Sequence, residues 1–128
     1  MIQKINHVGI AVKNVDEAVK FFEENFGAEL INKVELEFMQ QISALVQIGE
    51  SQFELMEGMG EESVISKYIE KKGEGIHHIS LFVDNIDKAC DELEAKGLRI
   101  INRIPAMKMA FVHPKSVFGI LVELAEKM

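Results

Sequence analysis

The stretch "EGIHHISLFVDNIDKA", at residues 74–89, repeats a pattern that the chain has already used in "KINHVGIAVKNVDEA", at residues 4–18. In this alignment His7 matches His78. Three more segments follow in the same order in both halves: "LINK", "ALVQ" and "FELME" in the first, and "IINR", "AFVH" and "VELAE" in the second. Two copies are too few for a solenoid, which needs several stacked units. The repeat therefore predicts two similar modules within one chain.

Each module is predicted to consist of a strand, a helix and three further strands. The first strands are expected at 5–12 and 76–83, and Asn14 and Asn85 follow them as helix N-caps. We expect the helices to end at Gly27 and Gly97, and the other strands near 28–34, 41–48, 52–57, 98–103, 107–113 and 119–124. The modules span about 4–58 and 75–126, and a linker helix is predicted at about 61–72.

Strand alternation predicts a polar face that both modules share. Side chains along a strand alternate between its two faces, and the apolar residues of one parity are expected to pack on the helices. The residues of the other parity then carry one histidine and one glutamate from each module. These four residues are His7, Glu54, His78 and Glu123.

Two imidazoles and two carboxylates that converge on one point are a donor set for a divalent cation. The mixture of nitrogen and oxygen suits Zn, Ni, Co, Mn or Fe(II), and the sequence does not choose among them. A single histidine on a strand is usually an ordinary polar residue, so the matched placement of all four residues is what favours a metal site. His77 and Cys90 are predicted to be structural.

Composition narrows the class of protein. The chain has 128 residues, of which 48% are hydrophobic and 27% charged, as is ordinary for a globular protein. Its net charge of −7, without a basic cluster along the sequence, argues against nucleic-acid binding. No apolar run is long enough to cross a bilayer, and the N-terminal residues do not resemble a signal peptide. The single cysteine leads us to expect a cytoplasmic protein without disulfides.

These modules and the His/Glu/His/Glu set resemble the vicinal oxygen chelate superfamily, which includes glyoxalase I and extradiol dioxygenases. Within it, "NHVGIAV", "GEGIHHIS" and "AFVHPKSVFGILVEL" are most similar to the methylmalonyl-CoA epimerase family. The resemblance implies one α+β domain over 1–128, in which eight strands form a partly open cup or barrel around a metal. It also implies a homodimer and a small acyl-CoA or thioester substrate.

The implied reaction is epimerisation of an acyl-CoA such as methylmalonyl-CoA, through an enolate that the metal stabilises. Some epimerases use a glutamate on the third strand as the base, but Ser43 stands at that position here, with Gln41 beside it. The loop before "AFVHP" is also shorter than in the family. We therefore predict Glu123 as the catalytic base, Glu54 as its partner for reprotonation, and Glu37 as a less favoured base.

Strand parity also predicts the walls of the substrate pocket. The polar face continues over Gln41, Ser43, Leu45, Met109 and Phe111, which combines an apolar surface with a few hydrogen-bonding groups. Met109 and Phe111 are equally well interpreted as core residues. Lys115 in "HPKS" is predicted in a hairpin turn, where an exposed lysine is more common than a phosphate ligand.

Two other functions stay open at this point. A lyase similar to glyoxalase I would act on the thiol adduct of a 2-oxoaldehyde. A binding protein without catalytic activity, similar to bleomycin-resistance members of the superfamily, typically lacks the metal ligands that are present here.

Overall fold

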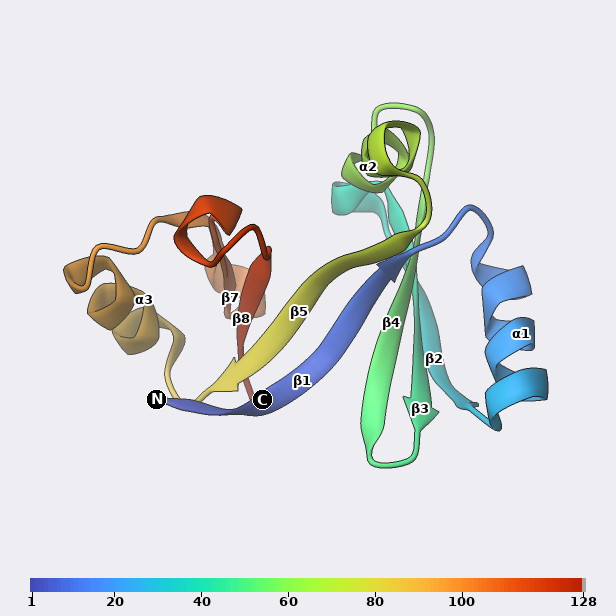
Figure 1. Cartoon of the computed structure of the whole chain (residues 1–128), viewed down its shortest axis with the longest axis horizontal. Helices are drawn as coiled ribbons and strands as arrows, with labels where there is room; N and C mark the ends of the chain where they lie inside the picture. Colours follow the sequence, from blue (N-terminus) through green and yellow to red (C-terminus); the bar gives the residue numbers. More distant parts are fainter. Residues whose placement is uncertain (128) are drawn as a thin grey trace. The chain divides into compact units, whose positions relative to one another are not determined.

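The computed structural model describes residues 1–127 and contains three α-helices and eight strands (Figure 1). The strands are β1 (Ile2–Ala11), β2 (Glu29–Leu36), β3 (Gln41–Ile48), β4 (Ser51–Gly58), β5 (Gly75–Val83), β6 (Ile100–Ile104), β7 (Met109–Val112) and β8 (Val122–Glu126). The helices are α1 (Val15–Phe26), α2 (Val64–Lys72) and α3 (Ile86–Ala95), and the short 3₁₀ helices are η1 (Glu37–Met39), η2 (Pro105–Met107) and η3 (Pro114–Ser116). No helix of the described chain has the length and apolar composition that crossing a membrane requires.

The eight strands form one mixed sheet in the order β2-β3-β4-β1-β5-β8-β7-β6. β2 and β6 are its edges, so the sheet is open and does not close into a barrel. In the first half of the chain β1 is parallel to β4, which pairs antiparallel with β3, and β3 with β2. In the second half β5 is parallel to β8, which pairs antiparallel with β7, and β7 with β6. The predicted α+β fold with two βαβββ repeats is confirmed.

Backbone contacts divide the chain into two compact units. One unit comprises residues 8–77, and the other combines residues 1–7 with residues 78–128. We refer to them as the 8–77 unit and the 78–128 unit. The boundaries fall inside β1 and β5, so each of these strands contributes to both units.

The predicted helix caps are confirmed in both repeats. The Asn14 side chain accepts a hydrogen bond from the Glu17 backbone N–H at 2.9 Å, and Asn85 accepts one from Lys88 at the same distance. Glycine follows both helices with a left-handed backbone, at φ 67° for Gly27 and 95° for Gly97. Glycine adopts this conformation without the steric cost that a side chain adds.

A second cap at each helix start comes from a distant strand. The Glu57 carboxylate of β4 accepts the Val15 backbone N–H at 2.8 Å, and the Glu126 carboxylate of β8 accepts that of Ile86 at 3.0 Å. Negative charge is favourable at a helix N-terminus, where backbone N–H groups lack partners within the helix. The last glutamates of "FELME" and "VELAE", Glu57 and Glu126, therefore connect the start of each helix to the last strand of its module by a hydrogen bond.

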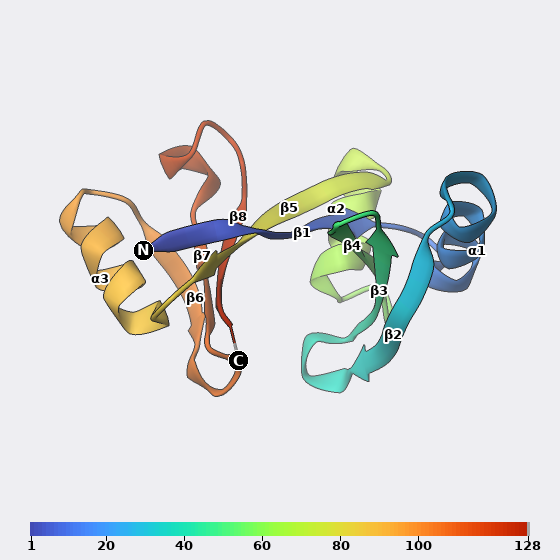
Figure 2. The same ribbon diagram turned by 90° about the horizontal axis from the view of Figure 1, so that it is seen from below.

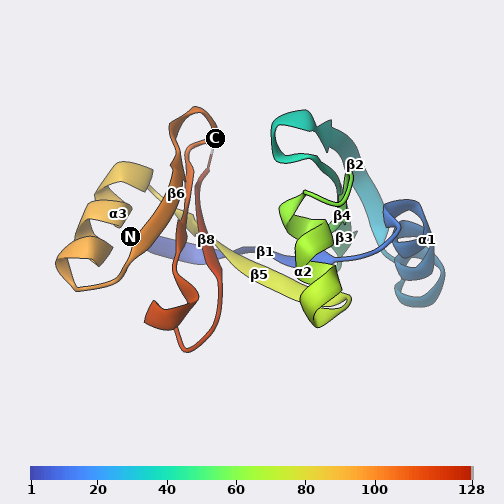
Figure 3. The ribbon, with the colours of Figure 1, turned by 90° about the horizontal axis from the view of Figure 1, so that it is seen from above.

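Each unit has its own apolar core. In the 8–77 unit, α1 and α2 lie on opposite faces of the strands (Figures 2 and 3). α1 packs on the face that carries Leu55, while Ala11 and Met56 on the other face contact Ile65 of α2. In the 78–128 unit, α3 packs on its strands through a cluster that includes the fully buried Cys90. Cys90 is thus part of the core, as predicted, and burial raises the pKa of its thiol.

The last strand of the second module begins later than predicted. The expected strand at 119–124 starts only at Val122, because the preceding residues form η3 and a turn. Pro114 begins η3, and both Phe118 and Gly119 have positive φ, which is incompatible with an extended strand. The linker helix likewise begins at Val64, after Ser63 caps it, rather than near residue 61.

The close approach of β4 to the start of α2 makes Gly58 a position where any side chain is expected to destabilise the fold. A β-carbon there would collide with the Ser63 and Ser66 hydroxyls and lie 2.8 Å from the Ser66 backbone nitrogen. We expect Gly58→Ala to lower the free energy of unfolding by roughly 1–3 kcal/mol, which urea denaturation can measure. Gly49→Ala is the control, because that site has open space and only a positive φ. An equal or smaller loss for Gly58→Ala would contradict this packing argument.

Candidate metal centre

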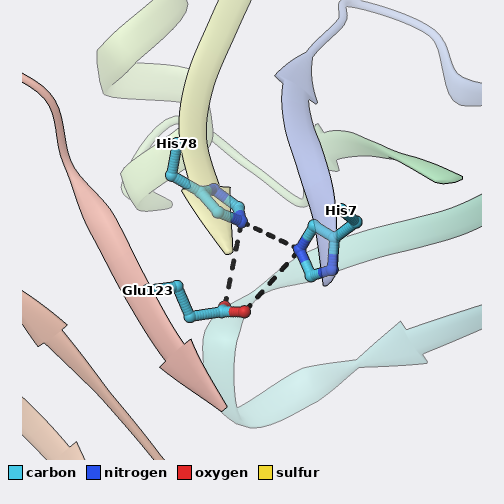
Figure 4. A group of neighbouring side chains, drawn as sticks. All are labelled: His7, His78 and Glu123. Atoms are coloured by element: carbon cyan, nitrogen blue, oxygen red, sulfur yellow. Dashed lines mark hydrogen bonds and ion pairs between the residues drawn. The ribbon is translucent and has the colours of Figure 1, made fainter. Parts of the chain in front are cut away.

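Three of the four predicted ligands meet in the 78–128 unit. His7 of β1, His78 of β5 and Glu123 of β8 point toward one another (Figure 4). The two histidine Nε2 atoms are 3.1 Å apart, and the Glu123 carboxylate oxygens lie 3.6 Å from His7 Nε2 and 3.8 Å from His78 Nε2. The structure therefore brings together one imidazole from each repeat and one carboxylate.

Strand register explains this convergence. β5 and β8 are parallel, with Ile79 opposite Val122 and Ser80 opposite Glu123. Val122 and Leu124 are directed into the core with α3, so Glu123 lies on the opposite face, together with His78. A hydrogen bond of 3.2 Å from the Asn6 side chain to the Ser80 hydroxyl adds a polar contact beside His7. Sequence reasoning did not identify this contact, although Ser80 shares the parity of His78.

The three side chains are largely removed from water. His78 is 4% exposed and Glu123 6% exposed. A buried carboxylate is costly unless positive charge or hydrogen bonds compensate it. With two imidazoles as near neighbours, the group favours a proton or a cation at its centre.

The geometry fits a divalent metal ion. Ligand atoms at about 2.0–2.2 Å from a metal are separated from one another by about 2.8–3.6 Å in tetrahedral or octahedral arrangements. The observed separations of 3.1, 3.6 and 3.8 Å lie within this range or just beyond it. Two imidazole nitrogens with one carboxylate also match the donors that borderline divalent metals prefer.

One aromatic ring lies beside His78 and Glu123. Phe111 of β7 lies opposite Glu123 in the strand register, and its ring meets the His78 ring edge to face at 6.3 Å between centroids. Met109 lies two residues earlier on the same strand face and is 9% exposed. The predicted parity of both residues is correct, and their part in substrate binding stays a prediction.

The remaining predicted site residues belong to the 8–77 unit. Glu54 of β4 is opposite Leu45 of β3 and Gly9 of β1 in the register, so all three share one strand face. On that face the Gln41 amide donates a hydrogen bond of 2.8 Å to the Ser43 hydroxyl, and each of these side chains is 5% exposed. The parity predicted for these residues is correct. The role of Glu54 as a fourth ligand stays a prediction.

His77 has the structural environment that the sequence suggested, although its partner is a residue of the linker helix. Its ring meets the Tyr68 ring edge to face at 4.9 Å, and the Tyr68 hydroxyl donates a hydrogen bond of 2.6 Å to the Ile76 carbonyl. Burial lowers the pKa of His77, while the negative charge of Glu54 acts in the opposite direction. His77 therefore belongs to the contact between β5 and α2.

Comparison with known proteins agrees with this arrangement. The family model of the Glyoxalase/Bleomycin resistance protein/Dioxygenase superfamily matches residues 4–124. The mitochondrial methylmalonyl-CoA epimerase of Dictyostelium discoideum is 36% identical over 132 residues, which cover 98% of this chain and 80% of that protein.

Solved structures show the same fold. The crystal structure of methylmalonyl-CoA epimerase from Mycobacterium tuberculosis is 30% identical, with a TM-score of 0.91 over 99% of this chain and 89% of that one. A methylmalonyl-CoA epimerase in complex with methylmalonyl-CoA and NH4+ is 29% identical, with a TM-score of 0.91 over 99% and 96% of the two chains. The chain therefore belongs to the Glyoxalase/Bleomycin resistance protein/Dioxygenase superfamily, and methylmalonyl-CoA epimerases are among its relatives.

Proposed function

We propose that the protein is a metal-dependent epimerase of an acyl-CoA such as methylmalonyl-CoA. The observation that carries the proposal is the buried group of His7, His78 and Glu123, in a chain that resembles methylmalonyl-CoA epimerases over nearly its whole length. A related epimerase has been solved with methylmalonyl-CoA, which supports this class of substrate.

His7 and His78 would hold the metal through their Nε2 atoms, and Glu123 through a carboxylate oxygen. A bound divalent ion would act as a Lewis acid that stabilises negative charge developing on the thioester oxygen during the reaction. The candidate ligand atoms already lie 3.1–3.8 Å from one another, which supports binding of such an ion with little rearrangement.

Proton removal from the α-carbon is assigned to Glu123. Neither Ser43 nor Gln41 can accept a proton at neutral pH, and their side chains are hydrogen-bonded to each other. Glu123 is a carboxylate beside both histidines, and with 6% of its surface exposed it has little contact with water. Glu54 is assigned to return the proton to the other face of the substrate, as predicted from the repeat.

The proposed function is tested by exchange at the α-carbon. In deuterium oxide, the metal-loaded protein is expected to exchange the α-proton of methylmalonyl-CoA and to interconvert its two epimers, as followed by NMR. The same sample is tested with the hemithioacetal of a 2-oxoaldehyde, the substrate type of a glyoxalase I-like lyase. Turnover of the hemithioacetal without α-proton exchange on methylmalonyl-CoA would favour the lyase over the epimerase.

Two further features stay predictions from the family resemblance. One is a homodimer, which light scattering at micromolar concentration can detect. The other is a cytoplasmic location. Neither is needed for the assignment of Glu123.

A further inference from the structure

The loop between β7 and β8, residues 113–121, is held firmly despite its surface position. The His113 backbone N–H donates to the Arg99 carbonyl at 2.8 Å, and the Ser116 hydroxyl accepts the Arg99 N–H at 3.1 Å. Within the loop, the Gly119 N–H donates to the Pro114 carbonyl at 2.8 Å, and Val117 packs against the apolar core under α3. The conformation of this loop is therefore set by specific contacts.

Phe118, in this loop, has an unfavourable backbone conformation and an exposed apolar side chain. Its φ is 53°, a left-handed conformation that costs a bulky residue roughly 1 kcal/mol and that glycine adopts freely. Its side chain is also fully exposed, so the ring gains no burial against the described residues 1–127. Backbone strain is often found at functional sites. The strain at Phe118 therefore suggests that its exposed ring contacts a binding partner.

The loop adjoins the candidate metal centre within the same unit. Its last residue, Leu121, accepts a hydrogen bond of 3.1 Å from the backbone N–H of Ile79, the neighbour of His78. Glu123 follows two residues later, at the start of β8. Glu123 is five positions after Phe118 in the sequence, so their backbones lie within about 18 Å of each other. A long ligand bound at the metal centre can therefore extend to this loop.

The charge of this region differs from that of the whole chain. Residues 99–121 contain four basic residues and no Asp or Glu, although the net charge of the protein is −7. Arg103 and Lys108 form ion pairs with acidic residues outside the segment. Arg99 lies against the loop through its backbone, and Lys115 within the loop is exposed. An exposed aromatic ring near exposed basic side chains suits a base with attached phosphates.

We propose that the loop binds the nucleotide end of coenzyme A. Phe118 would stack on the adenine, and Lys115 and Arg99 would face the phosphates. This inference rests on the proposed acyl-CoA substrate, and it assigns the recognition of the distant end of that substrate. Phe118 is thus a specificity residue that does not touch the reacting atoms.

The test is Phe118→Gly, measured by calorimetry with 3′-phosphoadenosine 5′-diphosphate, the nucleotide portion of coenzyme A. Stacking on an aromatic side chain predicts a loss of affinity of about 5- to 100-fold. Because glycine tolerates the positive φ, the same variant is expected to keep or raise the melting temperature. Phe21→Ala, at a half-exposed phenylalanine on α1, is the control and is expected to bind the nucleotide like the parent.

The phosphate contacts are tested by Lys115→Ala. We expect about a 2- to 10-fold loss of nucleotide affinity at low salt and a smaller loss at high salt, because screening weakens exposed charge pairs. Lys20→Ala, at an exposed lysine on α1, is the matched control. With adenosine as the probe, Phe118→Gly is expected still to weaken binding, and Lys115→Ala is expected to have no effect.

Enzyme kinetics distinguish the proposed role of the loop from the proposed epimerase reaction. Phe118→Gly is expected to raise KM for methylmalonyl-CoA with little change in kcat, and to leave KM for the truncated methylmalonyl-pantetheine thioester unchanged. Equal nucleotide binding by the variant and the parent would overturn the role of the loop, even if the protein is an epimerase. A mass change on Phe118→Gly in light scattering would also overturn it and would assign the loop to a contact between copies of the chain. Nucleotide binding that depends on Phe118, in a protein without epimerase activity, would contradict only the proposed reaction.

Discussion

Replacing Glu123 with glutamine is expected to slow α-proton exchange by roughly 10²–10⁴-fold, the usual worth of a positioned acid or base. The amide keeps the shape of the side chain and an oxygen that can face the metal, but it cannot accept a proton at neutral pH. Because glutamine has nearly the same shape as glutamate, the substitution removes the base and should leave the contacts of this side chain with His7 and His78 largely in place. Metal affinity should therefore fall far less than the rate.

The measurement is deuterium exchange at the α-carbon with metal-saturated protein, separated from net epimerisation. Glu24→Gln, at an exposed carboxylate on α1, controls for the change in net charge and should exchange at the parental rate. Glu54→Gln is expected to spare proton removal more than proton return if the two carboxylates divide the work by face. Parental exchange by metal-saturated Glu123→Gln would exclude Glu123 as the base and favour Glu37 or a metal-bound hydroxide.

Replacement of His78 by alanine is expected to remove metal binding and to reduce α-proton exchange by at least about 100-fold. A bound metal would contribute several kcal/mol of charge stabilisation in the proposed reaction, and the buried His78 would supply one of its ligand atoms. The variant also leaves the buried Glu123 carboxylate with one imidazole fewer beside it, so thermal stability should fall as well.

Calorimetric titration with Zn, Ni, Co and Mn salts measures this effect directly. Glu94→Gln, at a carboxylate on α3 that pairs with Arg103, controls for the loss of an acidic side chain and should bind metal as the parent does. A chelator should inactivate the parent, and one or more of these ions should restore its activity. Unchanged affinity for these ions in His78→Ala would contradict the metal centre. Full activity of the parent after exhaustive chelation would contradict the metal-dependent mechanism.

Much of the fold was accessible from the sequence because the same local signals occur twice. Alternation along the strands was enough to place His7, His78 and Glu123 on one face, and Asn14 and Asn85 were recognisable as caps from their position alone. These signals are local, and the repeat made each of them more specific. Glu54 is on the predicted strand face, but its participation in the metal centre depends on more than strand parity.

The features that the sequence did not predict depend on contacts between distant residues. Nothing local to Glu57 or Glu126 indicates that their carboxylates cap helices about 40 residues earlier in the chain. The covering of Ala11 by α2 likewise results from packing between separate elements. The late start of β8 has a partly local cause in Pro114, but the positive φ of Phe118 runs against the preference of phenylalanine and could not be expected from it.

The division of β1 between the two units has a consequence for biosynthesis. His7 is 71 residues from His78, and Glu123 lies still further along the chain, so His7 is synthesised well before the two residues that it contacts. The 8–77 unit is continuous in sequence, and all its strands are available before β6 has been made. Closing the 78–128 unit instead requires the N-terminal residues to return across the whole chain, which makes this step the slower one on grounds of loop-closure entropy. A metal held by all three side chains would therefore bind only after residue 123 has been made, and a nascent chain stalled before that residue cannot bring the three side chains together.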